Sequence, residues 1–254
     1  MRVTTMVLVS SVSLVAAAAC SRPGAGARDT TGVRVQGSAT ANGCADLVTS
    51  ADLTRFLRMA PDSGGDAGGL FHGRAEWGAV VNRGGQVCAL VPPSDSLGGF
   101  WPGSRSISMA KAFTANGFST DGSPLSTARL YTLAQPGHSL WGVTQPEPFD
   151  PQCYGPSVEN RVCGGAITFG GGVPLYKDGR IVGGLGVSGD TPCADHEIAK
   201  RVRRFAGLEP KGGSAADDIQ YSKTDKPSVF THPLCPNTWR NGQKIGEEMV
   251  ASGY

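Results

Sequence analysis

The protein has a small net charge. Its 23 Lys and Arg residues nearly balance 21 Asp and Glu residues, which leaves +2 on 254 residues. Because nucleic-acid binding needs positive charge concentrated on one face, this balance predicts no nucleic-acid partner. Lys200, Arg201, Arg203 and Arg204 form no basic stripe, since they fall together in the last turns of one expected helix, where cations favour the helix dipole.

Hydrolytic motifs are also lacking. Ser188 stands in "GVSG", which does not supply the strand-to-helix elbow of G-x-S-x-G. No motif places a pair of carboxylates, and we interpret Asp217 and Asp218 as capping or solvated residues. No internal repeat is visible, and 37 Gly and 17 Pro stay below the level of low-complexity sequence. These absences argue against a hydrolase and a repeat protein.

The one apolar run at the N-terminus, residues 6–14, is too short to cross a bilayer. With a single Arg before it and small residues after it, the run predicts an export signal over residues 1–19. Two processing interpretations are open: Ala17 and Ala19 fit ordinary signal cleavage, whereas residues 17–20 form an imperfect lipobox that would lipidate Cys20. We expect the lipoprotein, held at the cell envelope by its lipid alone, with secretion as the alternative.

Cysteine arithmetic supports that choice. Removing Cys20 from seven cysteines leaves an even set, which in an exported chain predicts disulfides. Sequence alone does not select among the pairings. The set that we favour is Cys44–Cys88, Cys153–Cys163 and Cys193–Cys235. Residues 20–43 have almost nothing to bury and predict a flexible tether, followed by a single domain over residues 44–254.

The domain's elements alternate between hairpins and helices. Residues 77–91 and 166–189 each read as two strands around a turn, and residues 103–117 and 191–207 read as helices. This order predicts an α/β domain of the α+β type, with a mostly antiparallel sheet flanked by helices.

The second hairpin contains an unusual number of glycines. Gly184, Gly186 and Gly189 spell G-x-G-x-x-G, but the tight turn at 178–179 makes the pairing antiparallel and the helix cannot start before Thr191. A dinucleotide site is therefore rejected. Two interpretations remain open for the glycine strands: close packing against a helix or second subunit, or a flat ligand lying on bare backbone.

At this point the residues resemble a known family. "FGGGVPLYKDGRIVGGLGVSGD" is similar to the signature hairpin of the GlcG/HbpS-like haem-binding family, and "AVVNRGGQVCAL" with "SMAKAFTA" resembles its strand–turn–strand–helix segment. The stretches "LSTARLYTLAQPGHSLWG", "SGDTPCADH" and "HPLC" resemble a longer, exported branch. The resemblance implies a GlcG-like fold, frequent homo-oligomers, and ligands of the tetrapyrrole class such as haem, which some relatives degrade.

Candidate haem contacts are chosen from the residues themselves, because ligand positions vary within that family. A C-x-x-C-H motif is absent, which excludes covalent c-type haem. His138, in a loop beside Trp141, is the first candidate axial ligand, with a solvated loop histidine as the alternative; His72 has a similar setting. Arg105 and Lys111 are expected to pair with the haem propionates, with ordinary surface charges as the alternative. His196 is expected to face the same pocket. The backbone contacts are expected at Gly171, Gly172, Gly184 and Gly186.

A metal site competes with one of the disulfides. Cys193 with His196, and His232 with Cys235, read C-x-x-H…H-x-x-C, the ligand set of structural zinc. We favour the disulfide and no metal, because export leads to an oxidising compartment.

Three functions remain in competition. The first is an exported binding protein for haem or a similar tetrapyrrole, for storage, sensing or protection. The second is an enzyme that degrades haem oxidatively or acts on another small molecule in the same pocket. The third is a non-enzymatic module in which the glycine surface is an oligomer interface.

Overall fold

Two β-hairpins form the centre of the fold. The computed structural model describes residues 43–94 and 97–249. Strands β1 (Trp77–Asn82) and β2 (Val87–Val91) make the first hairpin, and β3 (Gly172–Lys177) and β4 (Arg180–Ser188) make the second. Because β1 also pairs with β4 in antiparallel register, the two hairpins join into one sheet in the order β2-β1-β4-β3.

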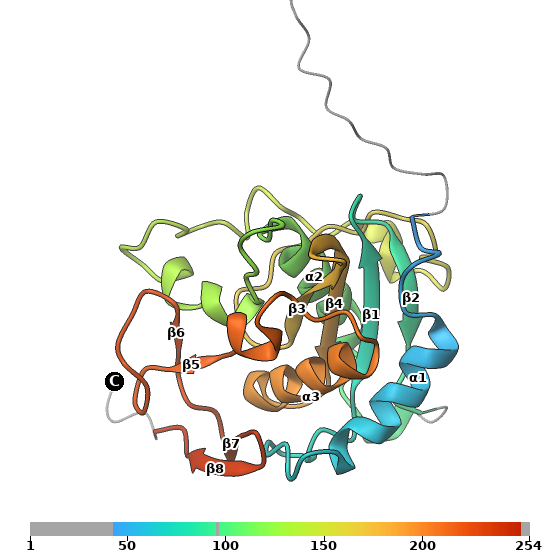
Figure 1. Cartoon of the computed structure of the whole chain (residues 1–254). Helices are drawn as coiled ribbons and strands as arrows, with labels where there is room; N and C mark the ends of the chain where they lie inside the picture. Colours follow the sequence, from blue (N-terminus) through green and yellow to red (C-terminus); the bar gives the residue numbers. More distant parts are fainter. Residues whose placement is uncertain (1–42, 95–96, 250–254) are drawn as a thin grey trace, which may run out of the picture. The chain divides into compact units, whose positions relative to one another are not determined.

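Helices cover both faces of this sheet. Helices α1 (Ser50–Met59) and α3 (Pro192–Phe205) lie on one face, and α2 (Ser104–Gly117) lies on the other (Figure 1). The expected fold class is therefore confirmed. The chain ends in two small sheets, one of β5 (Gln220–Tyr221) with β6 (Thr231–His232) and one of β7 (Thr238–Arg240) with β8 (Gln243–Gly246). None of the described helices is long and apolar enough to span a membrane.

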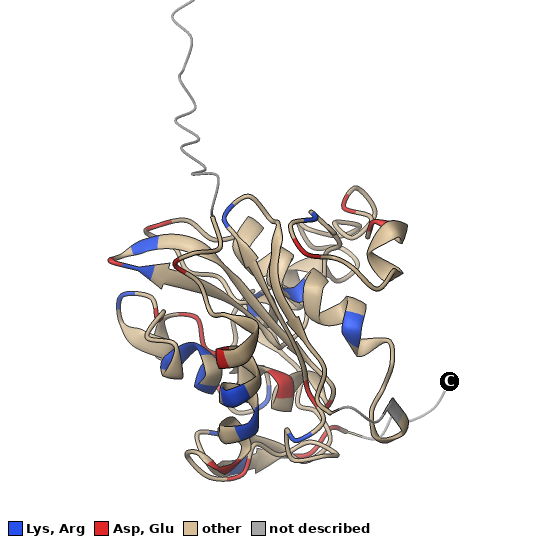
Figure 2. Ribbon diagram, turned by 90° about the vertical axis from the view of Figure 1, so that its right-hand side faces the viewer, with Lys and Arg blue, Asp and Glu red and all other residues tan. Residues whose placement is uncertain are grey.

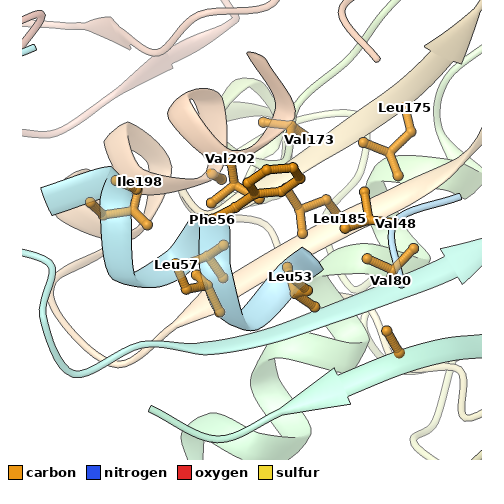
Figure 3. Close-up of a cluster of buried hydrophobic side chains, with 14 of the residues drawn as sticks. Val48, Leu53, Phe56, Leu57, Val80, Val173, Leu175, Leu185, Ile198 and Val202 are labelled. Atoms are coloured by element: carbon orange, nitrogen blue, oxygen red, sulfur yellow. The ribbon is translucent and has the colours of Figure 1, made fainter. Parts of the chain in front are cut away.

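The main core lies between the sheet and the helices α1 and α3. Helix α1 begins after Thr49, whose side chain accepts a hydrogen bond from the Asp52 backbone N–H, and it buries one apolar face. Figure 3 shows that face meeting the sheet and α3. Full burial contributes about 2 kcal/mol for each large aliphatic side chain. The residues of this core that Figure 3 labels are Val48, Leu53, Phe56, Leu57, Val80, Val173, Leu175, Leu185, Ile198 and Val202.

Helix α2 lies on the glycine-rich face of the second hairpin. A Cβ atom added at Gly186 would overlap the carbonyl oxygen of Ser108, and one at Gly184 would overlap that of Ala112. At Gly172 an added Cβ would meet the backbone of Lys111. Close packing of a helix within the chain thus explains these glycines, and α2 fills the space in which a flat ligand was expected.

The structure contains all three favoured disulfides. Cys44 is joined to Cys88, Cys153 to Cys163, and Cys193 to Cys235. The first links the start of the described chain to β2, and the third links the N-terminal turn of α3 to the C-terminal region. Cys20, the export signal and most of the tether lie outside the described residues.

The basic run of α3 reaches the last turn of the helix, as expected, and most of it is also paired in the interior. Lys200, Arg201 and Arg203 are buried, and each is paired with a carboxylate. Figure 2 shows the run as blue segments along one helix beside the sheet. The physical reason is that α3 lies between the sheet and the C-terminal segment, so that most of its circumference is covered.

Candidate functional site: a hollow over α2 and a buried polar centre behind it

The outer side of α2 carries an open hollow. It has a volume of about 250 Å³ and lies between α2, the segment 165–167 and the loop 144–154. Ile107 and Ala110 form its floor, and Phe149 and Tyr154 stand at its wall with ring centroids 5.2 Å apart. The Tyr154 side chain is largely exposed. The lining also includes the polar residues Ser106, Thr144 and Glu147. An apolar floor with an aromatic wall and a few polar groups suits a flat, largely apolar ligand.

Arg105 holds the wall of this hollow in place. Its guanidinium donates hydrogen bonds to the carbonyl oxygens of Cys153 and Gly155, at 2.7 Å in both cases. The Cys153–Cys163 disulfide fixes the same segment. Arg105 thus positions the residues around Tyr154, and its expected contact with a propionate stays a prediction.

Lys111 is the centre of a buried polar cluster behind the hollow. Its ammonium lies 2.5 Å from a carboxylate oxygen of Asp195 and donates to the carbonyl oxygen of Val187. Neither partner of the pair is accessible to solvent, so both the propionate role and the surface-charge alternative for Lys111 are wrong. Gly171, with φ of 116°, leaves the room for this pair, because a Cβ there would lie 2.6 Å from the Lys111 ammonium.

Glu76 adds a second carboxyl group to the cluster. It is buried just before β1, and both of its oxygens lack a hydrogen-bond donor among the described residues. Burial, and after it the charge of Asp195, raise the pKa of Glu76 well above its usual range. Asp195 already accepts hydrogen bonds from the backbone N–H groups of Gly189 and Asp190. The proton therefore belongs on Glu76, which donates it toward Asp195.

Two buried histidines lie on either side of Gly170. The Gly170 backbone N–H donates to Nε2 of His232 at 3.4 Å, and a Cβ on Gly170 would lie 3.1 Å from the Cβ of His196. Burial lowers the pKa of both imidazoles, to about 4 for His232. Nδ1 of His196 is buried without a partner among the described residues.

Only part of the expected zinc set comes together. The ligand atoms of Cys193, His232 and Cys235 lie within 4.8 Å of one another, and His196 is outside this group. The two sulfur atoms are bonded to each other, as we expected.

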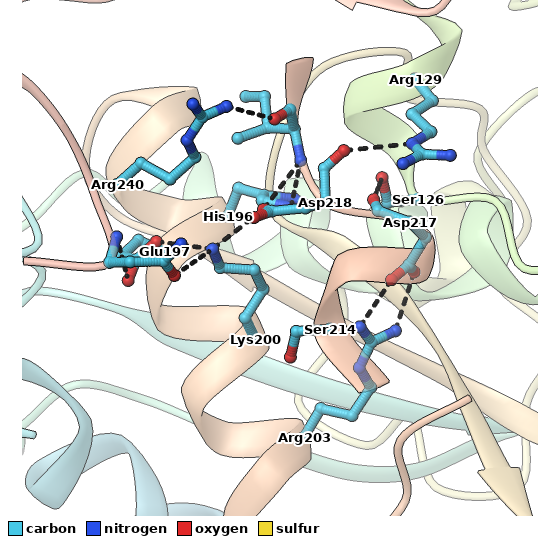
Figure 4. Close-up of polar contacts among 12 residues, drawn as sticks. Ser126, Arg129, His196, Glu197, Lys200, Arg203, Ser214, Asp217, Asp218 and Arg240 are labelled. Carbon is cyan, nitrogen blue, oxygen red and sulfur yellow. Dashed lines mark hydrogen bonds and ion pairs between the residues drawn. The ribbon is translucent and has the colours of Figure 1, made fainter. Parts of the chain in front are cut away.

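The outer side of α3 carries an extended ion network (Figure 4). Lys200 lies 2.8 Å from Glu197 and 2.9 Å from Asp218, and Arg203 forms a two-pronged ion pair with Asp217 at 2.6 and 2.8 Å. The interpretation of Asp217 and Asp218 as capping or solvated residues is therefore wrong. No local sequence pattern marks this pairing, which depends on the chain turning back over the helix.

The remaining candidates lie at the surface. His138 is exposed in the loop between the segments 132–134 and 151–154, and its backbone closes turns with Gln135 and Trp141. Its role as an axial ligand stays a prediction. His72 is also exposed and lies 3.0 Å from Asp66. The hollow over α2 is the feature that sequence reasoning missed, since Phe149 and Tyr154 belong to an irregular loop without a periodic pattern.

The architecture defines a class of protein: an α+β domain built on a glycine-rich antiparallel hairpin, with a small apolar hollow on its covering helix. The family model described as haem degrading protein, HbpS-like, matches residues 76–203, just over half of the chain. The protein belongs to this HbpS-like family.

Curated relatives match over shorter stretches. Corrinoid adenosyltransferase PduO of Salmonella typhimurium is 33% identical over 97 residues, which are 38% of this chain and 23% of PduO. An uncharacterised 15.0 kDa protein of Citrobacter freundii is 28% identical over 122 residues, which are 48% of this chain and 69% of that protein. The chain thus spans about a quarter of the length of PduO.

Solved structures with a similar course of the chain have low sequence identity. Klebsiella pneumoniae ORFY matches with a TM-score of 0.45 and 22% identity over 63% of this chain and 90% of that one. The PduOC:haem complex matches with a TM-score of 0.44 and 23% identity over 61% and 88% of the two chains.

Proposed function

We propose that this protein binds haem or a similar planar tetrapyrrole, and that the ligand lies in the hollow over α2. The observation that carries the proposal is an apolar, aromatic-walled hollow on a chain of the HbpS-like haem-degrading family. The corrinoid in the name of PduO belongs to the same broad ligand class, and we transfer the class alone, not the adenosyl transfer.

The hollow's shape bears on how such a ligand is held. It is open, with Ile107 beneath and Phe149 and Tyr154 on one side, so one face of a macrocycle packs against α2 while the other stays uncovered. A second copy of the chain would cover that face, and we propose a homo-oligomer on this ground. Tyr154 carries an exposed hydroxyl at the wall and is our first candidate for an axial ligand, ahead of the predicted His138.

A haemin titration tests the proposal. The chain from Ser21 onward, with its disulfides intact, is titrated while the visible spectrum is recorded. We expect a saturable, shifted Soret band. Ile107→Glu places a charge on the floor of the hollow and should weaken binding at least tenfold. The matched control is Leu70→Glu, which alters an exposed apolar side chain outside the hollow and should leave binding unchanged.

The variants also separate the candidate ligands. Tyr154→Phe should alter the position of the Soret band, and His138→Ala should not. A spectrum equal to that of free haemin plus protein removes the proposal, and equal weakening by both glutamate variants removes the hollow as the site. Light scattering with and without haemin measures the number of copies.

Haem degradation is the second candidate, because the matching family model carries that activity in its description. The assay is loss of the Soret band in air with ascorbate as the reductant, compared between the wild type and Ile107→Glu. Loss at the rate of free haemin in both would exclude the activity.

We also propose that the protein is exported and carries a lipid on Cys20. Support comes from the N-terminal sequence and from the three disulfides, which suit an oxidising compartment. Cys20→Ala should release the protein from the membrane fraction if the lipid holds it there. Membrane attachment that survives this change would overturn the proposal.

A further inference from the structure

The Cys193–Cys235 disulfide is surrounded by features that a structural disulfide does not need. Both cysteines and His232 are buried, and their ligand atoms lie within 4.8 Å of one another. Thiolate and imidazole are the ligands that Zn²⁺ prefers, and they are held here by a helix, a short strand and the loop that follows the strand.

His232 has the arrangement of a prepared ligand. Its Nδ1 lies 2.7 Å from the carbonyl oxygen of Pro233, which accepts only, so Nδ1 carries the proton. Nε2 is then left with a lone pair, and among the residues that the structure describes it is met by the long contact from the Gly170 N–H alone. A metal-binding imidazole is neutral and donates its other N–H to a carbonyl in this way. Tyr131 packs against the imidazole, with the two ring centroids 4.9 Å apart.

The surroundings also favour thiolates. The backbone N–H of Cys193 donates to the sulfur of Cys235 at 3.2 Å. Cys193 lies in the first turn of α3, a helix of 14 residues, where the positive end of the helix dipole stabilises a nearby negative charge. A thiolate formed at Cys235 would therefore have a hydrogen-bond donor already in place.

We propose that the Cys193–Cys235 disulfide masks a zinc site, and that its reduction lets Cys193, Cys235 and His232 bind one Zn²⁺. A dithiol reductant supplies two electrons and two protons, the bond between the two sulfurs breaks, and the reductant becomes a disulfide. Zn²⁺ then replaces the two thiol protons, which pass to solvent. Three protein ligands leave the fourth tetrahedral position for water.

Co²⁺ is the probe for this site, because thiolate-bound Co²⁺ absorbs in the near ultraviolet. The chain from Ser21 onward keeps every described residue and is reduced with a phosphine. We expect one Co²⁺ per chain with a thiolate band, displaced by Zn²⁺, and no band before reduction. The band should vanish in Cys193→Ser/Cys235→Ser, persist in the matched control Cys44→Ser/Cys88→Ser, and need at least tenfold more Co²⁺ in His232→Gln.

Two results overturn the proposal. The first is that the reduced wild type keeps its native near-ultraviolet circular dichroism spectrum but shows no thiolate band with Co²⁺. The second is that the thiolate band survives in Cys193→Ser/Cys235→Ser. If reduction itself abolishes the native spectrum, one equivalent of Zn²⁺ should restore it in the wild type but not in that variant. Failure to restore it overturns the proposal as well.

Discussion

Glu76→Gln should stabilise the protein, and the gain should grow with pH. Glu76 is buried next to Asp195 and holds its proton at a pH at which an unfolded chain has lost it. An amide N–H at this position donates toward Asp195 as the protonated carboxyl does, without a proton that can be lost. The substitution is nearly isosteric, so it leaves no cavity.

The sign and the size follow from proton linkage. Burial and Asp195 raise the folded-state pKa of Glu76 above its unfolded value of 4.5. Its contribution is therefore complete below pH 4.5 and is lost as the pH rises toward the folded pKa. One proton corresponds to about 1.4 kcal/mol of unfolding free energy for each pH unit in that window. The difference between Glu76→Gln and the wild type should start near zero at pH 4 and increase with this slope.

Glu197→Gln is the matched control. Glu197 is also buried, but its pKa is lowered. Burial alone would raise this pKa, and the nearby positive charges of Lys200 and Arg201 lower it by more. Its contribution is present above the unfolded pKa of 4.5 and is lost as the pH falls through the folded pKa. Glu197→Gln should therefore cost about 3 kcal/mol at pH 7, with a smaller loss in acid.

Urea unfolding of the three proteins from pH 4 to pH 8 decides the matter, with the disulfides intact. If Glu76→Gln is less stable than the wild type at every pH, or if its advantage does not depend on pH, the assignment of the proton to Glu76 is refuted.

Two further changes test the packing. Gly186→Ala puts a methyl group where the Ser108 carbonyl oxygen of α2 lies, so that α2 must move. We expect the unfolding free energy measured with urea to fall by about 2 kcal/mol or more. Haemin binding in the hollow on the same helix should also weaken. A stability within 0.5 kcal/mol of wild type, on the scale of ordinary surface changes, would contradict the close approach of α2 to β4. Arg203→Met leaves Asp217 buried without its two-pronged partner. We expect the unfolding free energy at pH 7 to fall by about 3 to 5 kcal/mol. Adding Asp217→Asn to the same chain should restore part of that loss. Additive losses in that double variant would show that the two residues do not act as a pair.

The sequence by itself determined the local elements of this protein. Turn residues placed both hairpins, and cap residues such as Thr191 placed the start of α3, because these signals act within a few residues. Helix α1 was missed although Leu53, Phe56 and Leu57 repeat at helical spacing after Thr49. That signal was available and needed no tertiary information.

Only the tertiary structure decided which residues share a site. Lys111 and Asp195 are 84 residues apart, and their pairing depends on α2 and α3 approaching the end of β4 from opposite faces of the sheet. The glycines of β4 carried two interpretations until α2 was seen to lie against them. Burial pairs Lys200 and Arg203 of α3 with Asp218 and Asp217, because an ion removed from water needs a partner and only the folded chain supplies it.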